Sequence, residues 1–559
     1  MKIVIVGGVA AGMSCAARAR RLDESAEIVV LERGEHVSFA GCGLPYHLGG
    51  EIESADSLLV QTPESLRAAL NLDVRTGHDV VGLDPQERSV RVRTREGEQT
   101  IAYDALVLAP GATAVRPPVP GLDSPRVRTL RTVADAVALR GLLDGGARRA
   151  VVLGGGFIGI EAAEQLARAG VDVAVVELAP HVLPMLEPEL ATLVTDELAR
   201  LGVDVHAGVA ATAVEHHEDA DVVVLADGTR LPADLVVLAV GVRPDTAAFE
   251  RSGVECERGA IVVDGLGRTN LPGVWAAGDA VVVTDAVTGA RRPVPLAGPA
   301  NRAGRGVADA ILRPGTARRL PRALGTAIVR VGDLAAATTG ADRATLARAG
   351  VAHHTLHLHA SQHAGWYPGA HPVHLVVHFD DDGRLLGAQA VGADGVDKRI
   401  DVLATAMRAG LTVGDLVDLD LAYAPPFGAA KDPVNLVGMA AGNVLDGTLR
   451  VWHATDLAVV AETALVLDVR SREEFATGHV PGALNVPHTE LRERLDDVRE
   501  AADGRPVRAL CGSGVRSHIA HRVLAQHGFD SASLSGGMLT LRATPGAADR
   551  LVTEEVLVP

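Results

Sequence analysis

Short apolar runs alternate with helical patterns along the first half of the chain. The first run covers Lys2–Val6, a helical pattern then continues through Arg21, and a second run covers Glu27–Leu31. The same order returns at Val151–Leu153, a helix through Ala169, and Val173–Val176. Because strands joined by helices form parallel sheets with helices on their faces, the pattern predicts two doubly wound α/β domains.

Three further apolar runs indicate how the two domains are connected. Tyr103–Leu108 reads as a buried strand that leaves the first domain at Pro110 and Gly111. Leu235–Val242 reads as a further buried strand. Gly273–Ala277 is an apolar strand that stops at a Gly-Asp pair and looks like a return to the first domain. The second domain is therefore predicted to be an insertion into the first.

The pattern changes in the second half of the chain. Val373–Phe379 reads as a strand and Ile400–Arg408 as a helix, which is typical of an α+β domain. Leu465–Val469 and Val507–Leu510 are strands of a final α/β segment that could fold alone. The predicted domains are 1–112 and 245–321 (first nucleotide domain), 113–244 (second), 322–446 (α+β dimerisation domain) and 447–559 (C-terminal domain).

Composition narrows the classes of partner and compartment. The 559 residues exceed what one core holds, and 47% apolar with 22% charged residues is globular. A formal net charge of −17 argues against nucleic acid and anionic membrane. With no apolar run of membrane-spanning length and no signal-peptide pattern, we expect a cytoplasmic protein. Four scattered cysteines predict neither a disulfide scaffold nor a metal cluster.

The glycine spacing of the second domain predicts a dinucleotide site. Gly154, Gly156 and Gly159 stand between a strand and a helix, so that the turn is tight, the pyrophosphate can approach and the helix can pack closely. Phe157 and Ile158 lie in the same turn. Glu177 ends the next strand, where a carboxylate accepts ribose hydroxyls and repels a 2′-phosphate, which favours NADH while leaving NADPH possible.

The first domain carries an imperfect copy of this turn. Gly7, Val9 and Gly12 occupy the three positions, and Gly8 supplies freedom that Val9 lacks. Glu32 stands where a ribose-binding acid belongs. Further residues expected at this cofactor are Ala10, Ala11, Arg33 and Ser38.

Cys42 is the candidate redox residue. It stands among glycines just before Pro45, a residue typical of a helix start, and a cysteine at a helix N-terminus is expected to have a lowered pKa. No second cysteine follows within Gly41–Gly50. A lone thiolate must pair with an external sulfur or with an oxidised form of itself. Cys15 and Cys256 are interpreted as structural.

Two further motifs resemble those of the pyridine nucleotide-disulfide oxidoreductases. They are Ala109-Pro110-Gly111-Ala112 and Ala276-Ala277-Gly278-Asp279. The resemblance covers about residues 1–443. It implies FAD in the outer domain with Asp279 at the ribityl chain, NADH in the inserted domain, and an interface domain that makes a homodimer.

The surroundings of Cys42 resemble the coenzyme A-disulfide reductases and their persulfide-reducing relatives. Residues 363–369 and 423–433 extend the likeness. It implies that Tyr367 and Tyr423 reach the cysteine of the partner subunit, orient the substrate sulfur and protonate the departing thiolate. The residues that it suggests for the polyanion coenzyme A are Arg18, Arg21, Ser38, Asn301 and Arg302.

The C-terminal segment resembles the rhodanese domains. Cys511 opens a loop of small residues, 511–517, between a strand and a helix, and 468–475 with 478–483 resemble the flanking rhodanese signatures. Successive backbone amides of such a loop form an anion-binding nest for a thiolate or persulfide. Arg516 is a candidate substrate-binding residue. Cys511 is thus the expected sulfur carrier, with an inactive docking domain as the alternative.

Together these features predict a flavin-dependent, NADH-driven reductase of a small disulfide or persulfide, with the appended carrier favouring persulfide or polysulfide. One alternative is an NADH oxidase or peroxidase that cycles Cys42 through a sulfenic acid. Val9 and Ala10 stand where those relatives carry a histidine, which disfavours peroxide chemistry. Another alternative is a non-enzymatic sulfur-delivery or redox-sensing module.

Overall fold

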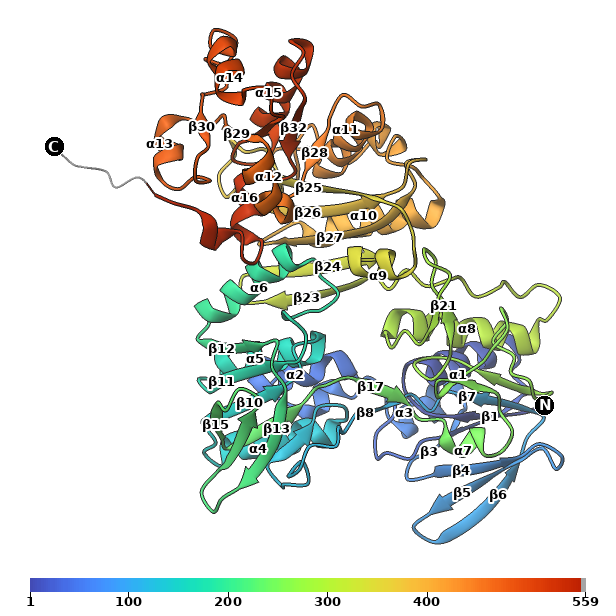
Figure 1. The fold of residues 1–559 in the computed structure, drawn as a ribbon. Coiled ribbons are helices and arrows are strands. Elements are labelled where there is room, and N and C mark those ends of the chain that lie inside the picture. Colours follow the sequence, from blue (N-terminus) through green and yellow to red (C-terminus); the bar gives the residue numbers. More distant parts are fainter. Residues whose placement is uncertain (554–559) are drawn as a thin grey trace. The chain divides into compact units, whose positions relative to one another are not determined.

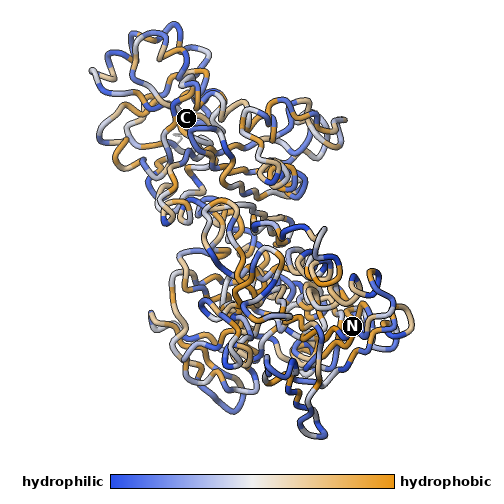
Figure 2. The backbone as a smooth tube through the Cα atoms, turned by 90° about the vertical axis from the view of Figure 1, so that its right-hand side faces the viewer, coloured by the Kyte–Doolittle hydropathy of each residue, from blue (hydrophilic) through white to orange (hydrophobic). Residues whose placement is uncertain are grey.

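The computed structural model describes residues 1–553 and divides them into two compact units. The first unit comprises Met1–Pro180 and Leu201–Gly325, and the second comprises His181–Arg200 and the chain from Thr326 onward. Figure 1 labels their elements, and in Figure 2 the hydrophobic stretches lie inside the folded parts while the projecting loops are hydrophilic. Within residues 1–553, no helix combines the length and the apolar character that crossing a membrane requires.

The first nucleotide domain is a five-stranded parallel sheet, as its sequence pattern predicts. The strands follow the order β20 (Val274–Ala276), β7 (Ala105–Leu108), β1 (Lys2–Val6), β2 (Glu27–Leu31) and β3 (Asp73–Arg75). The helices α1 (Ala10–Leu22) and α8 (Ala297–Leu312) pack against each other, and the antiparallel strands β4 (Asp79–Asp84), β5 (Ser89–Thr94) and β6 (Gly97–Ala102) form a separate sheet. Because β20 follows the second nucleotide domain in the sequence, the chain returns to this sheet after leaving it.

The second nucleotide domain repeats this arrangement. Its parallel sheet has the order β12 (Val203–Ala207), β11 (Asp172–Glu177), β10 (Arg149–Leu153), β16 (Leu235–Leu238) and β9 (Val127–Thr129), with helices α4 (Val133–Asp144) and α5 (Phe157–Arg168). The strands β13 (Ala211–His216), β14 (Asp221–Leu225) and β15 (Arg230–Ala233) form an antiparallel layer.

The chain passes between these two domains on a two-stranded ribbon. β8 (Ala112–Ala114) pairs antiparallel with β17 (Val242–Pro244). The single strand predicted over Leu235–Val242 is therefore wrong, since β16 ends at Leu238 and Gly241 turns the chain with a φ of 107°. The helix α6 (Pro188–Arg200), which lies inside the predicted range 113–244, belongs to the second unit instead.

The second unit contains an antiparallel sheet and a parallel sheet. The antiparallel one, predicted as α+β, has the order β23 (Ala327–Val331), β24 (Leu334–Gly340), β27 (Leu385–Gly392), β26 (Pro372–Phe379) and β25 (His354–Ser361), with α9 (Arg343–Arg348), α10 (Val396–Ala409) and α11 (Pro433–Leu445). The parallel one has the order β28 (Val451–Trp452), β32 (Ser531–Leu534), β31 (Val507–Leu510), β29 (Leu465–Asp468) and β30 (Leu484–Asn485). Its helices are α12 (Leu457–Thr463), α13 (Arg472–Ala476), α14 (Leu495–Ala502), α15 (Val515–Gln526) and α16 (Gly537–Ala543).

A buried polar network ties α6 and both sheets of the second unit together. His357 on β25 donates from Nε2 to Glu189 at 2.7 Å and accepts at Nδ1 from the Ser535 hydroxyl at 2.9 Å. Arg343 donates to Glu187 at 2.8 Å and to Glu189 at 2.7 Å. His378 and Arg343 hold the pKa of Glu187 at about 2 against the opposing effect of its burial. Breaking one partner of such a buried pair costs about 3–5 kcal/mol.

The folding stability of the second unit is expected to fall in acid, because His453 lies near His357 and Arg343 of this network. Burial, together with the nearby charges of His357 and Arg343, lowers the pKa of His453 to about 4, although Asp456 and Glu189 oppose the shift. The unfolded chain protonates this imidazole near pH 6.5, whereas the folded chain keeps it neutral, so stability is full above that pH and declines as the pH falls toward 4. The His453→Gln variant should lose up to about 1.4 kcal/mol per pH unit of this dependence, measured by calorimetric melting across the range. His217→Gln, at an exposed histidine of the first unit, is the control, and equal slopes in His453→Gln and the parent would contradict the assignment.

Candidate functional site: two nucleotide turns and two sulfur centres

The first glycine turn depends on backbone contacts that leave no room for a side chain. A Cβ at Gly7 would lie 2.0 Å from the Ala109 carbonyl oxygen, and one at Gly12 would lie 1.9 Å from that of Gly7. Gly7 also has a φ of 98°, which favours glycine. Val9 is the N-cap of α1 and makes no side-chain capping bond, so the first amides of the helix are not capped by that side chain.

The second turn has the same geometry. A Cβ at Gly159 would lie 1.9 Å from the Gly154 carbonyl oxygen, and Gly154 has a φ of 106°. Gly156 differs, because no atom lies within 4 Å of a Cβ placed there. Open space at the N-cap of α5, whose first turn includes Phe157 and Ile158, is what an approaching pyrophosphate needs.

An acid supports each turn from the end of the neighbouring strand. Glu32 accepts the amides of Gly8 at 2.8 Å and Gly34 at 2.7 Å. Glu177 accepts those of Gly155 at 2.6 Å and Ala179 at 2.7 Å. Each carboxylate therefore holds its turn as well as standing where the ribose is expected, and its remaining lone pairs can accept further hydrogen bonds.

The two later flavin motifs lie beside the first turn. Asp279 follows the positive-φ residue Gly278 and pairs with Arg131 at 2.9 Å, while Arg131 also donates to the Ala112 carbonyl at 3.2 Å. Pro110 accepts from Arg33 at 3.2 Å. No local sequence pattern marks Arg131, which lies 148 residues from its partner Asp279.

Cys42 is an exposed, reduced thiol in a 3₁₀ turn, Gly41–Gly43, just before α2 (Leu44–Gly49). Pro45 stands at the helix start as predicted. The charged groups that influence Cys42 are Glu161 on α5, Arg131 and Asp279. Glu161 also accepts a hydrogen bond from the Tyr46 hydroxyl at 3.3 Å.

Taken together, the surroundings of Cys42 raise its pKa, so the prediction of a lowered pKa is wrong. Partial burial raises the pKa, the Glu161 carboxylate raises it further, Arg131 opposes them, and Asp279 adds a small increase. The turn before a two-turn helix is too short to outweigh a nearby carboxylate. Glu161 was missed by sequence reasoning because nothing in a helix pattern marks which face meets a distant loop.

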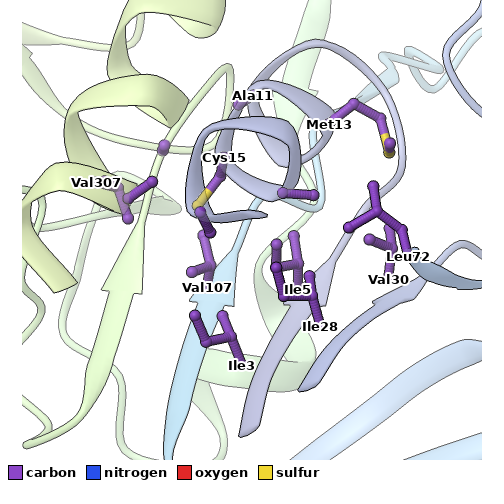
Figure 3. Close-up of a cluster of buried hydrophobic side chains, with 14 of the residues drawn as sticks. Ile3, Ile5, Ala11, Met13, Cys15, Ile28, Val30, Leu72, Val107 and Val307 are labelled. Atoms are coloured by element: carbon purple, nitrogen blue, oxygen red, sulfur yellow. The ribbon is translucent and has the colours of Figure 1, made fainter. Parts of the chain in front are cut away.

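Cys15 and Cys256 confirm their structural interpretation. Figure 3 shows Cys15 in the core with Ile3, Val107 and Val307, and its burial raises its pKa to about 12. Cys256 packs at the edge of a second core, where burial also raises its pKa.

The polar side chains predicted for coenzyme A lie on or near α1 and α8, and several already have partners. Arg18 donates to Asp309 at 2.7 Å and 2.8 Å, and Asn301 accepts from Ser14 at 2.5 Å. Arg21 and Arg302 are exposed. Ser38 has a φ of 47°, and its amide donates to the Gly8 carbonyl at 2.8 Å. Arg18 is the least available of these because its charge is compensated.

Tyr367 and Tyr423 belong to the second unit and stand on exposed aromatic segments. Their exposed fractions are 38% and 50%, and Trp366 and Phe427 nearby are 76% and 73% exposed. The Ala364 amide donates to the Gly428 carbonyl at 2.9 Å, so the two segments lie side by side. Such a set of exposed aromatic residues is typical of an interaction surface.

Cys511 lies at the C-terminal end of β31 and is 1% exposed. Its Sγ accepts from the Gly514 amide at 3.2 Å and from the Ser517 hydroxyl at 3.4 Å, so one amide and one hydroxyl stand where the prediction had successive amides. The N-terminal part of α16 holds the loop in place, since the Met538 amide donates to the Cys511 carbonyl at 2.8 Å. A Cβ at Gly537 would lie 2.5 Å from that carbonyl oxygen, a close approach that sequence reasoning missed.

Three protein families match this chain. "Pyridine nucleotide-disulphide oxidoreductase" matches residues 1–299, its dimerisation domain matches 326–433, and "Rhodanese-like domain" matches 454–543. The chain belongs to the pyridine nucleotide-disulphide oxidoreductase family.

Curated members of the family are similar over the first four-fifths of the chain. Coenzyme A disulfide reductase of Staphylococcus haemolyticus is 34% identical over 446 residues, which are 79% of this chain and 99% of the relative. A protein named NADH oxidase from Methanocaldococcus jannaschii is 32% identical over 441 residues, 78% of this chain and 97% of the relative.

Two solved structures of the family match along nearly the whole chain. Reduced CoADR-RHD of Bacillus anthracis is 39% identical with a TM-score of 0.96 and covers 99% of both chains. A NAD-dependent persulfide reductase from A. fulgidus is 36% identical with a TM-score of 0.91, covering 97% of this chain and 100% of its own.

The family implies FAD and NAD(P)H, and the two turns of this chain fit them. The residues that would hold FAD are those of the first turn with Glu32 and the strand ends at Ala109–Gly111 and Asp279. Those that would hold the nicotinamide nucleotide are the second turn and Glu177. In both, glycines without room for a Cβ lie beside a helix N-terminus that lacks a side-chain cap.

The Glu161→Gln variant tests the charge environment of Cys42. Removing the carboxylate should lower the pKa of Cys42, so its alkylation by iodoacetamide at neutral pH should become several-fold faster. An effect of about this size is expected when one unit charge is removed near a partly exposed thiol. Peptide mass spectrometry of the reduced holoprotein measures the rate at Cys42 alone. Glu53→Gln, at an exposed acid in the same region of the chain, should leave it unchanged, and an unaltered rate in Glu161→Gln would refute the assignment.

Proposed function

We propose that this protein uses NAD(P)H and FAD to reduce coenzyme A persulfide, coenzyme A disulfide or polysulfide through Cys42, with Cys511 collecting the sulfane sulfur. The observation that carries the proposal is the presence in one chain of two thiols in different settings. One is exposed beside the flavin-type turn, and the other is buried in a loop that directs an amide and a hydroxyl at its sulfur.

The proposed reduction proceeds by thiol–disulfide exchange at Cys42. Its thiolate attacks the sulfur that is bonded to the carbon of a coenzyme A persulfide, which forms a mixed disulfide and releases sulfide. When bound, NAD(P)H and FAD supply the electron pair that splits this mixed disulfide. The pair and one proton restore the Cys42 thiolate and release the coenzyme A thiol. With a coenzyme A disulfide, the first leaving group is a coenzyme A thiolate instead.

Residues of the chain have distinct parts in this scheme. Arg131 favours the thiolate form of Cys42, because it opposes the carboxylates that raise the pKa of that thiol. Tyr367 and Tyr423 of a second copy are assigned to orient the substrate sulfur and protonate the leaving thiolate. Their exposed segments and the matched dimerisation domain support a homodimer.

The decisive experiment compares Cys42→Ser with Cys511→Ser in the full chain. Cys42→Ser should lose at least about 10³-fold in NADH-driven reduction of coenzyme A persulfide, because no other group can form the mixed disulfide. Cys511→Ser should keep turning over free coenzyme A persulfide, since the carrier is not needed for a substrate already in solution. Intact mass before and after NADH would show what Cys42 holds.

Other results would identify the alternatives. Full activity in Cys42→Ser contradicts the proposal. Loss of all output in Cys511→Ser favours a sulfur-delivery module. NADH consumption with oxygen alone, accompanied by one added oxygen on Cys42, favours the oxidase.

We also propose that Glu177 sets the preference for NADH. Glu177→Gln loses the charge and keeps one acceptor oxygen, so only one of the Gly155 and Ala179 amides, which bind different carboxylate oxygens, retains its partner. The ratio of kcat/KM for NADPH to that for NADH should rise about tenfold, or 1.4 kcal/mol. Steady-state kinetics with both nucleotides measures the ratio. Flavin content should stay constant, because Glu177 belongs to the other turn, and an unchanged ratio would contradict the assignment.

A further inference from the structure

The charge of Arg516, the only charged side chain of the loop 511–517, is already balanced by an acidic partner. Arg516 donates to both carboxylate oxygens of Glu474, at 2.6 Å and 2.7 Å. Its Nη2 lies 3.2 Å from the position that a Cβ on Gly512 would take, so the guanidinium lies over the loop next to Cys511.

Glu474, the partner of Arg516, stays ionised across the neutral pH range. Arg516 lowers the pKa of Glu474 to about 2, although partial burial opposes the shift. Both partners are thus charged near neutral pH, and the pair contributes no net charge. Glu474 is also tied to the start of α13, because it accepts the Ser471 amide at 3.1 Å.

Apolar side chains border the same loop. Val515 and Ile519 stand one turn apart on α15 and are 64% and 45% exposed. Leu539 is 44% exposed, and its amide donates to the Gly512 carbonyl at 3.0 Å. The surroundings of Cys511 therefore combine a compensated arginine with exposed hydrocarbon.

We infer that Glu474 makes the rhodanese site selective for organic persulfides over thiosulfate. Thiosulfate is a dianion that releases sulfite when it donates its outer sulfur, so its binding requires a cation whose charge is not already balanced. The charge of Arg516 is already balanced by Glu474. An organic persulfide carries less charge on its sulfurs and brings carbon atoms that can contact Val515, Ile519 and Leu539. This inference rests on the proposed carrier role of Cys511.

The transfer conserves atoms and electrons. The Cys511 thiolate attacks the terminal sulfur of R–S–SH, the donor S–S bond breaks as a new S–S bond forms, and R–S⁻ leaves. The proton of the donor passes to solvent or stays on the new persulfide. With thiosulfate the same attack would release sulfite. Neither reaction needs an added oxidant or reductant.

The test measures how fast Cys511 gains one sulfur from thiosulfate and from glutathione persulfide. Full-length holoprotein carrying Cys42→Ser is used throughout, so that Cys42 takes no sulfur, and peptide mass spectrometry follows the added atom. The parent should prefer glutathione persulfide. Glu474→Gln, which releases Arg516 without changing shape, should raise the thiosulfate rate relative to the persulfide rate about tenfold. Arg516→Met, which leaves Glu474 uncompensated, should lower it.

Glu490→Gln is the matched control. Glu490 forms a similar exposed pair with Arg472, at 2.6 Å and 2.7 Å, outside the Cys511 loop, so its removal should not alter the ratio. An unchanged ratio in Glu474→Gln, with Cys511 still loaded, overturns this inference alone. No loading of Cys511 by either donor overturns the carrier role and this inference with it.

Discussion

Close approach of backbone to backbone, which only glycine permits, positions the sites of this protein. At both nucleotide turns a glycine carbonyl contacts the helix that follows, within 2 Å of where a Cβ would stand. That contact brings the helix N-terminus to the end of the strand, with its amides directed outward and not covered by a capping side chain. Gly537 repeats the device at the rhodanese loop, where α16 holds the Cys511 segment through the carbonyls of that segment. The Gly514 amide remains directed at the Cys511 sulfur.

The two sulfur centres differ in how charge is compensated around them. Cys42 lies near Glu161, Asp279 and one arginine, and its pKa is raised. A thiol of this kind becomes nucleophilic when a cationic or polarising group comes close, or when its proton has a defined acceptor. Cys511 instead has an amide and a hydroxyl as donors and a neutral Arg–Glu pair beside it. The charges around Cys42 come from distant segments, whereas the donors to Cys511 come from its own loop.

Local signals allowed much of the fold to be predicted from sequence. Glycines between a strand and a helix, an acid at the end of the next strand and a cysteine in a small-residue loop act over a few residues, and the structure has each where expected. The prediction of a lowered pKa for Cys42 was wrong because it considered only the helix that follows this residue. Partial burial raises the pKa most, and the nearby charges of Glu161, which raises it further, and Arg131, which opposes, come from segments about a hundred residues away. Likewise, Arg18 read as a free cation until α8 brought Asp309 to it.

The contacts of α6 show the same limit, because residues 181–200 lie inside the predicted range 113–244 but group with the second unit. Its apolar face predicts a helix but not the surface against which it packs, and its position in sequence favoured the inserted domain. The acids that precede and begin it, Glu187 and Glu189, instead meet Arg343 and buried histidines of the second unit. Burying two carboxylates is unfavourable unless each is paired, so these acids fix the helix to the one surface that supplies the partners. Because His357 also bonds Ser535, which follows the rhodanese strand β32, the same network links the dimerisation sheet and the rhodanese sheet within one unit. The Cys511 loop thus belongs to a unit whose parts are joined by buried polar contacts that no periodicity could reveal.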